Sequence, residues 1–223
     1  MTVLVLVRHG LTRATGATLT GWAPGIHLTD EGRAGADRAA ERLAALPIRS
    51  IYSSPLERCR ETAAPLASRL RVSVRVRPQL GEIRFGEWTG RSLPQLRRTR
   101  LWRRVQLAPS NVRFPRGESF AEVQQRAVAE LLRIADEHPR DVVAVFSHAD
   151  VIKLVLAHFG GMHPDAFQRL VVDPCSVSVV AMQDGFPRIV KVNDTGDLSD
   201  LAPATRRRAA RRPRKPNGGQ VRG

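Results

Sequence analysis

The stretch Val3-Leu4-Val5-Leu6-Val7-Arg8-His9-Gly10 indicates the fold of this 223-residue chain. An unbroken run of valine and leucine is typical of a strand that is buried on both faces, as in a parallel sheet. The run then ends abruptly in an arginine, a histidine and a glycine. In doubly wound α/β proteins, ligands bind at the carboxyl ends of such strands. We therefore expect Arg8 and His9 to lie at a binding edge of the sheet.

Strand-like and helix-like segments alternate along the rest of the chain. Apolar runs predict further strands over residues 48–53, 72–76, 142–146, 177–182 and 189–192, the last two as a closing hairpin. Helical spacing of apolar residues predicts helices over residues 29–46, 93–107, 118–138 and 150–159. Because alternating strands and helices favour parallel pairing, we expect an α/β domain with α/β/α layers and a mostly parallel central sheet.

A further helix is predicted directly after the strand 48–53. Ser54 is its expected N-cap, Pro55 its first helical residue, and Glu57 the partner that completes a capping box. This start places Arg58 in the first helical turn, just beyond the end of a strand.

The charge of the chain is distributed unevenly. There are 36 Lys and Arg against 21 Asp and Glu, a formal net charge of +15. Over half of it lies between Ala202 and Gly223, which contain seven Arg, one Lys and no acid. Residues 201–223 are expected to form a basic disordered tail, either solubilising or in contact with nucleic acid. The 42% apolar content is sufficient for residues 1–200 to build one folded domain.

Several classes of protein are excluded. No apolar run approaches the ~20 residues that span a bilayer, and no basic segment precedes residues 3–7 as in a signal peptide. We therefore expect a cytoplasmic protein without membrane contact. Cys59 and Cys175 are too few for a disulfide framework or a cysteine metal site and are expected in the core. The histidines expected at the surface are His27, His138, His158 and His163.

Five polar residues lie at or just beyond the ends of predicted strands, namely Arg8, His9, Arg58, Glu82 and His148. A parallel sheet brings such residues to one edge. Guanidinium groups match the paired oxygens of a phosphate, and a neutral imidazole can attack phosphorus. A carboxyl group can protonate the leaving oxygen. These residue types indicate phosphoryl transfer from a small phosphorylated substrate.

Four segments occur in a specific order along the chain: Leu6-Val7-Arg8-His9-Gly10-Leu11-Thr12, residues 53–63, residues 81–90, and Phe146-Ser147-His148-Ala149. Together they resemble the motifs of the histidine phosphatases, also called the phosphoglycerate mutase-like superfamily. The resemblance covers residues 2–200. It implies a phosphoglycerate mutase-like fold, with residues 1–200 as the catalytic domain.

The resemblance also implies roles for the five polar residues. His9 would accept the phosphoryl group as a phosphohistidine, which water then hydrolyses. Arg8, Arg58 and His148 would bind the phosphate and stabilise the transition state. Glu82 would protonate the departing alkoxide and afterwards activate the water. The resemblance implies no metal and no cofactor.

Other positions are candidates for contact with phosphate or substrate: Thr12, Arg13, Thr15, Gly21 and Ala149. The loop after the first strand departs from the mutase pattern, because Leu11, Thr15 and Thr18 replace a Glu, an Asn and an Arg. Arg13 is a candidate replacement for the lost polar contacts. Asp150 is either an alternative acid or a favourable charge at a helix N-terminus.

The resemblance leaves the activity open. Residues 85–90 look like the phosphatase branches, and residues 91–117, an expected lid over the site, are shorter than in the mutases. A phosphatase is therefore favoured, with a phosphomutase as the alternative. Five arginines between Arg97 and Arg104 either select polyanionic substrates or form a solvated face. A third hypothesis is a polyanion-binding protein whose domain is catalytically weak and whose tail binds the polyanion.

Overall fold

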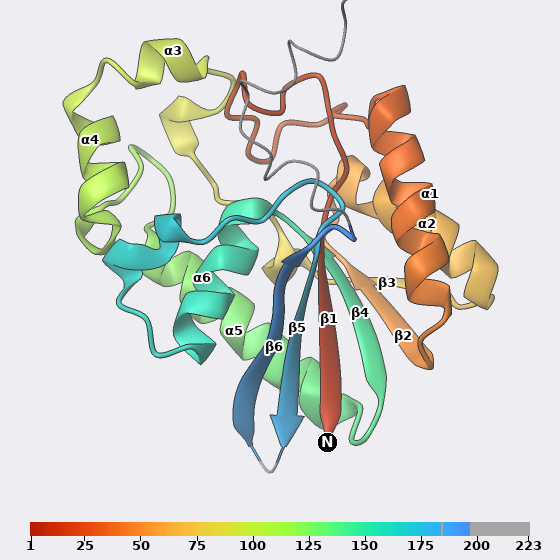
Figure 1. Ribbon diagram of the computed structural model, residues 1–223. Helices are drawn as coiled ribbons and strands as arrows, with labels where there is room; N and C mark the ends of the chain where they lie inside the picture. The colour runs from red at the N-terminus through yellow and green to blue at the C-terminus, as the bar shows by residue number, and fades with distance from the viewer. Residues whose placement is uncertain (184, 197–223) are drawn as a thin grey trace, which may run out of the picture.

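A six-stranded sheet lies at the centre of the computed structural model, which describes residues 1–183 and 185–196. Its strands are β1 (Thr2–Arg8), β2 (Ile48–Ser53), β3 (Val74–Val76), β4 (Val142–Ser147), β5 (Val177–Gln183) and β6 (Phe186–Asp194). Their order across the sheet is β3-β2-β4-β1-β5-β6 (Figure 1). The strands β1 to β4 pair in parallel, whereas β5 and β6 are antiparallel. The predicted mostly parallel sheet and its closing hairpin are confirmed.

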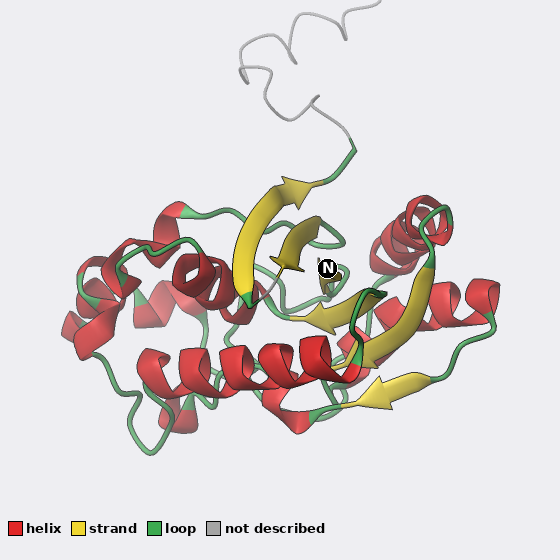
Figure 2. Ribbon diagram, turned by 90° about the horizontal axis from the view of Figure 1, so that it is seen from below, coloured by secondary structure: helices red, strands yellow, loops and turns green. Residues whose placement is uncertain are grey.

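Helices cover both faces of the sheet, as Figure 2 shows. The helices α1 (Asp30–Ala44) and α2 (Glu57–Leu70) contribute to the apolar cluster on one face. The helices α5 (Phe120–Glu137) and α6 (Ala149–Phe159) pack on the other face. The predicted three layers are therefore confirmed. None of the described helices is long and apolar enough to cross a membrane.

The remaining helices are short. Two of them, α3 (Leu93–Leu96) and α4 (Arg100–Leu107), lie in residues 91–117, here called the excursion, between the loop 81–90 and α5. The 3₁₀ turns are Pro78–Leu80, Gly86–Trp88, Pro109–Asn111 and Pro164–Arg169.

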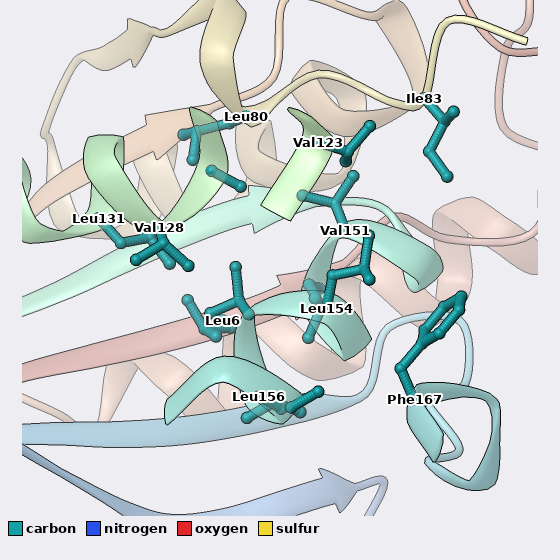
Figure 3. Close-up of a cluster of buried hydrophobic side chains, with 14 of the residues drawn as sticks. Leu6, Leu80, Ile83, Val123, Val128, Leu131, Val151, Leu154, Leu156 and Phe167 are labelled. Atoms are coloured by element: carbon teal, nitrogen blue, oxygen red, sulfur yellow. The ribbon is translucent and has the colours of Figure 1, made fainter. Parts of the chain in front are cut away.

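The larger apolar cluster fills the space between the sheet and the helices α5 and α6. Figure 3 shows Leu6 of β1 close to Leu131 of α5 and Leu154 of α6. All three side chains are at most 2% exposed. Burial of one such side chain stabilises the fold by roughly 1.5–3 kcal/mol. This packing makes the sheet a rigid base for the loops at its carboxyl edge.

Two predicted helix starts are confirmed. The hydroxyl of Thr29 accepts a hydrogen bond from the Gly32 amide at 3.0 Å, so Thr29 caps α1. Ser119 and Glu122 form a reciprocal capping box at the start of α5. Such caps stabilise a helix by about 1 kcal/mol.

The predicted start of α2 is wrong. The helix begins at Glu57 with Leu56 at the N-cap, and no side chain of the described residues caps it. Ser54 lies too early in the chain for this role, and its hydroxyl is 2.9 Å from Nε2 of His148. Arg58 still lies in the first turn, as predicted.

The prediction of one helix over residues 93–107 is also wrong, because this segment forms two helices. The turn between them ends at Thr99, whose hydroxyl accepts a hydrogen bond from the Trp102 amide and caps α4. The predicted strand 72–76 is shorter, since β3 pairs with β2 only from Val74 onward.

One histidine predicted at the surface is buried. His138 ends α5 and is 9% exposed, with Nε2 2.9 Å from the Tyr52 hydroxyl. His27, His158 and His163 are exposed as predicted. Cys59 is buried, whereas Cys175 is only half-buried, beside a surface cavity. The predicted tail, residues 201–223, lies outside the described residues.

Candidate active site

The carboxyl ends of β1, β2 and β4 meet at one edge of the sheet. Arg8 pairs with Ser147 across β1 and β4, and Ser53 pairs with Phe146 across β2 and β4. Backbone hydrogen bonds continue this alignment one residue further, from the His9 amide to Ser147 at 3.0 Å. Because the registers match, the residues that follow these strands emerge side by side.

His9 follows β1 and is 7% exposed. Its Nδ1 lies 2.8 Å from the carbonyl oxygen of Gly10. A carbonyl can only accept, so Nδ1 carries the proton and Nε2 keeps a free electron pair. Burial, together with the charge of Arg58, lowers the pKa of His9 to about 3. The imidazole is therefore neutral at physiological pH and chemically able to act as a nucleophile.

Arg58 occupies the space between two histidines and is 1% exposed. Its Nε donates to Nε2 of His9 at 3.3 Å, and its Nη2 donates to the Gly21 carbonyl at 3.0 Å. Its Nη1 is buried and has no hydrogen-bond partner among the described residues. A guanidinium with an unused donor beside the free electron pair of an imidazole is suited to binding a phosphate oxygen.

Arg8 supplies a second cation at the same edge. Its Nη1 donates to the carbonyl of Val172 at 2.7 Å, which holds the side chain in place. Its Nε is buried without a partner in the described part of the chain. Arg8 and Arg58 both line a cavity of about 140 Å³ that His9 and Glu82 also line.

His148 follows β4 and is fully buried. Its Nδ1 lies 3.3 Å from Nη2 of Arg58, which can only donate, so the ring proton lies on Nε2. That Nε2 is 2.9 Å from the hydroxyl of Ser54. The rings of His148 and His9 lie 5.2 Å apart. Burial and the charge of Arg58 hold the pKa of His148 well below its ordinary value.

Glu82 lies beside His148 and lines the same cavity as His9. Its Oε1 accepts a hydrogen bond from the Ile83 amide at 3.0 Å, and its Oε2 lies 3.7 Å from Nδ1 of His148. Burial raises the pKa of Glu82 to about 7, and the negative charge of Asp150 acts in the same direction. A carboxyl group with this pKa can give and take a proton near neutral pH.

The loop that carries Glu82 is held by residues that sequence reasoning missed. Trp22 donates through Nε1 to the Glu82 carbonyl at 2.6 Å. Arg126 of α5 donates to the same carbonyl at 2.9 Å and to the Gly81 carbonyl at 2.9 Å. Its Nε also pairs with Glu118 at 2.8 Å. No local pattern reveals these contacts, because they join segments far apart in the chain.

The other predicted positions lie in two places. Thr12, Thr15, Gly21 and Ala149 line the cavity with His9. The hydroxyls of Thr12 and Thr15 lie 3.0 Å apart. Arg13 instead lines a separate cavity beside His27. Asp150 lines the same cavity as Glu82.

The five arginines of the excursion are exposed, and none lines the cavity of His9 as formed by the described residues. In the part of the chain that the structure describes, no group of three His, Cys, Asp or Glu is placed to hold a metal ion.

The fold and the residues at this edge of the sheet agree with a known class of protein. A family model described as "Histidine phosphatase superfamily (branch 1)" matches residues 4–195. The chain belongs to this superfamily.

Relatives of the chain are named as phosphatases and as probable mutases. "Phosphoserine phosphatase 1" of Hydrogenobacter thermophilus is 28% identical over 211 residues, covering 90% of this chain and 96% of that protein. "Probable phosphoglycerate mutase GpmB" of Cronobacter sakazakii is 32% identical, covering 92% and 97%. The solved structure of "Bacillus stearothermophilus YhfR" superimposes with a TM-score of 0.82 at 29% identity, covering 87% and 98%. The names of the relatives therefore include a phosphatase and probable mutases.

Proposed function

We propose that the protein hydrolyses a small phosphomonoester through a phosphohistidine formed at His9. The observation that carries the proposal is the fixed tautomer of His9, whose protonated Nδ1 is bound to Gly10 while Nε2 contacts Arg58. If a substrate phosphate displaces Nε of Arg58 from Nε2 of His9, its phosphorus faces the free electron pair of Nε2. The two arginines, each with a buried unpaired nitrogen, would hold that phosphate.

In the first step, Nε2 of His9 attacks phosphorus and the bond between phosphorus and the ester oxygen breaks. The protonated carboxyl of Glu82 gives its proton to that oxygen, so the product leaves as a neutral alcohol. With a pKa of about 7, Glu82 is protonated in a large share of molecules at neutral pH. Arg8 and Arg58 line the cavity formed by the described residues and would stabilise the transferring group. His148 does not line it; its Nδ1 accepts a hydrogen bond from Arg58 and its Nε2 is hydrogen-bonded to Ser54, so its part is to position Arg58.

In the second step, the carboxylate of Glu82 takes a proton from a water molecule. The water oxygen attacks phosphorus, the bond between phosphorus and Nε2 breaks, and inorganic phosphate leaves. His9 returns to its neutral form and Glu82 to its acid form. The same carboxyl group therefore serves as acid and then as base.

The test combines activity with labelling. The His9→Ala variant should lose hydrolysis of p-nitrophenyl phosphate and should carry no acid-labile label after brief mixing with a ³²P-labelled substrate. The wild-type protein should carry such a label. His163→Ala is the matched control, because His163 is exposed and outside the cavity. Full activity of the His9→Ala variant would overturn the proposal.

A phosphomutase remains the second candidate, because relatives named as mutases are 29–32% identical to this chain. A mutase returns the phosphoryl group from histidine to a bound alcohol, whereas a phosphatase transfers it to water. Hydrolysis is favoured here by the resemblance of residues 85–90 to phosphatase branches. Release of phosphate from p-nitrophenyl phosphate without conversion of 3-phosphoglycerate to 2-phosphoglycerate would identify a phosphatase, whereas that conversion would identify a mutase.

A further inference from the structure

The cavity wall beyond the phosphate site is rich in hydroxyl groups. The loop after β1 runs above the carboxyl edge of the sheet (Figure 1) and lines the cavity with four threonines. These are Thr12, Thr15, Thr18 and Thr20. Leu19, Phe85 and Leu93 supply the apolar part of the wall. A wall of this kind offers hydrogen bonds to a polar, uncharged group together with some apolar contact.

Asp150 adds a negative charge to the same wall. It lies in the first turn of α6, and its side chain is 29% exposed. Lys153 is its ion-pair partner, but the separation is 3.5 Å and the Lys153 ammonium also donates to Gln168. The charge of Asp150 reaches the reacting groups, since it raises the pKa of Glu82. A second anion in this cavity would therefore meet an electrostatic barrier.

The cations of the cavity are already assigned to the phosphate. Among the described residues that line it, Arg8 and Arg58 are the positively charged ones. Both sit at the edge of the sheet beside His9, where the phosphoryl group binds in the proposed function. Arg13, the predicted substitute for a lost contact, lines another cavity.

We propose that the alcohol portion of the substrate is uncharged and bears hydroxyl groups, and that Asp150 discriminates against substrates with a carboxylate or second phosphate. This inference rests on the proposed phosphatase function. It assigns Asp150 to specificity, with Glu82 as the proton donor. Like charges that face each other across a binding site oppose binding, and the effect is larger in a partly buried site.

The test uses two substrates that share one primary phosphate ester. Glycerol 3-phosphate has a CH₂OH group where 3-phosphoglycerate has a carboxylate. We expect the wild-type kcat/KM for phosphate release to be at least about tenfold higher for glycerol 3-phosphate at low ionic strength. In Asp150→Asn the ratio should fall to about threefold or less, mainly through faster turnover of 3-phosphoglycerate. Because the two leaving groups are alike, an indirect effect on Glu82 largely cancels in the ratio.

Two further variants make the comparison specific. Glu87→Gln removes a carboxylate outside the cavity, one that pairs with Arg116 at 3.0 Å, and should leave the ratio unchanged. Asp150→Ser removes the charge with a different side chain that still suits a helix start. It should reproduce the ratio of Asp150→Asn, and it replaces that variant if the latter unfolds.

The outcomes separate this inference from the proposed function. Turnover of p-nitrophenyl phosphate combined with equal or faster turnover of 3-phosphoglycerate would overturn the inference alone. So would an unchanged ratio in both Asp150 variants, or no turnover of glycerol 3-phosphate. Absence of turnover on all three substrates would instead count against the phosphatase function itself.

Discussion

Arg126 of α5 and Glu82 are joined by a hydrogen bond of 2.9 Å from Nη2 to the main-chain carbonyl. Arg126 thus holds the backbone of the proposed acid without touching the reacting atoms. The same guanidinium donates to the carbonyls of Gln79 and Gly81, so one side chain fixes the whole approach to Glu82. Arg126 is in this sense a positioning residue.

Replacement of Arg126 by Met should therefore act on proton transfer more than on binding. We expect kcat for an alkyl phosphate to fall about ten- to hundredfold with KM little changed, since small displacements of a catalytic group are costly. Turnover of p-nitrophenyl phosphate, whose leaving group needs little protonation, should change far less. Arg126→Lys keeps the charge and should recover part of the activity.

Arg133→Met on the same helix is the control for that experiment, because Arg133 pairs with Glu130 away from the site. It should alter stability without altering the dependence of the rate on the leaving group. Equal losses on both substrates in Arg126→Met would show that the arginine acts only on the overall structure.

The raised pKa of Glu82 predicts a pH profile. With a pKa of about 7 in the folded protein, the acid form declines as the pH rises through 7. We expect kcat/KM for an alkyl phosphate, which follows the ionisation of the free enzyme, to decrease above about pH 7. This decrease should be absent from the profile of the slower Glu82→Gln variant. Since the pKa of His9 is about 3, its protonation should not limit the rate between pH 5 and 7. A decrease that persists in Glu82→Gln would assign it to another group.

The same shift makes a prediction about stability. The pKa of Glu82 is raised from 4.5 to about 7 by burial, so the folded state holds a proton that the unfolded state releases. The resulting stability is present below pH 4.5 and is lost as the pH rises through 7. This difference in pKa corresponds to about 3 kcal/mol at most. Urea unfolding should show Glu82→Gln gaining stability relative to the wild type between pH 5 and pH 8.5.

A difference between Glu82→Gln and the wild type that is constant across this range would contradict the shift. Comparing the two proteins at each pH cancels the titration of all other groups, provided that the substitution leaves them unchanged.

The close approach of α1 to the loop after β1 predicts a steric effect. A Cβ at Gly32 would lie 2.1 Å from the Leu11 carbonyl oxygen, so Gly32→Ala must displace the segment that follows His9. We expect a loss of about 1–3 kcal/mol in the free energy of unfolding and reduced kcat/KM. At Gly35 the nearest atom is the Cys175 sulfur at 3.1 Å, which can move, so Gly35→Ala should be milder. Equal stability of the two variants would contradict this reading.

The sequence reveals the parts of the fold that depend on local pattern. The apolar runs that end in Arg8 and in His148 predict both the parallel strands and the shared edge at which they end. An unbroken apolar run is sufficient to indicate a buried strand, and the position of the polar residues directly after it is sufficient to place them at its end. The cap Thr29 is equally predictable, because a cap bonds to an amide three residues away.

Other features depend on contacts that local pattern cannot show. Ser54 has the residue type of a helix cap, but its hydroxyl is used by His148, which is 94 positions away. His138 lacks an apolar context in sequence, yet Tyr52 and the sheet bury it. The hydrogen bonds from Trp22 and Arg126 to the Glu82 carbonyl likewise join segments that are distant in the chain.

Because β5 runs antiparallel to β1, the start of β5 lies at the same edge of the sheet as the end of β1. The residues that precede β5 reach the same edge as the residues that follow β1, and they bind Arg8 through the Val172 carbonyl and the Cys175 amide. Arg8, to which the proposed function assigns phosphate binding, is thus held by a segment that lies 164 positions later and approaches from the opposite direction. Insertions or deletions in the connection between α6 and β5 would therefore act on phosphate affinity, although that connection carries none of the reacting groups.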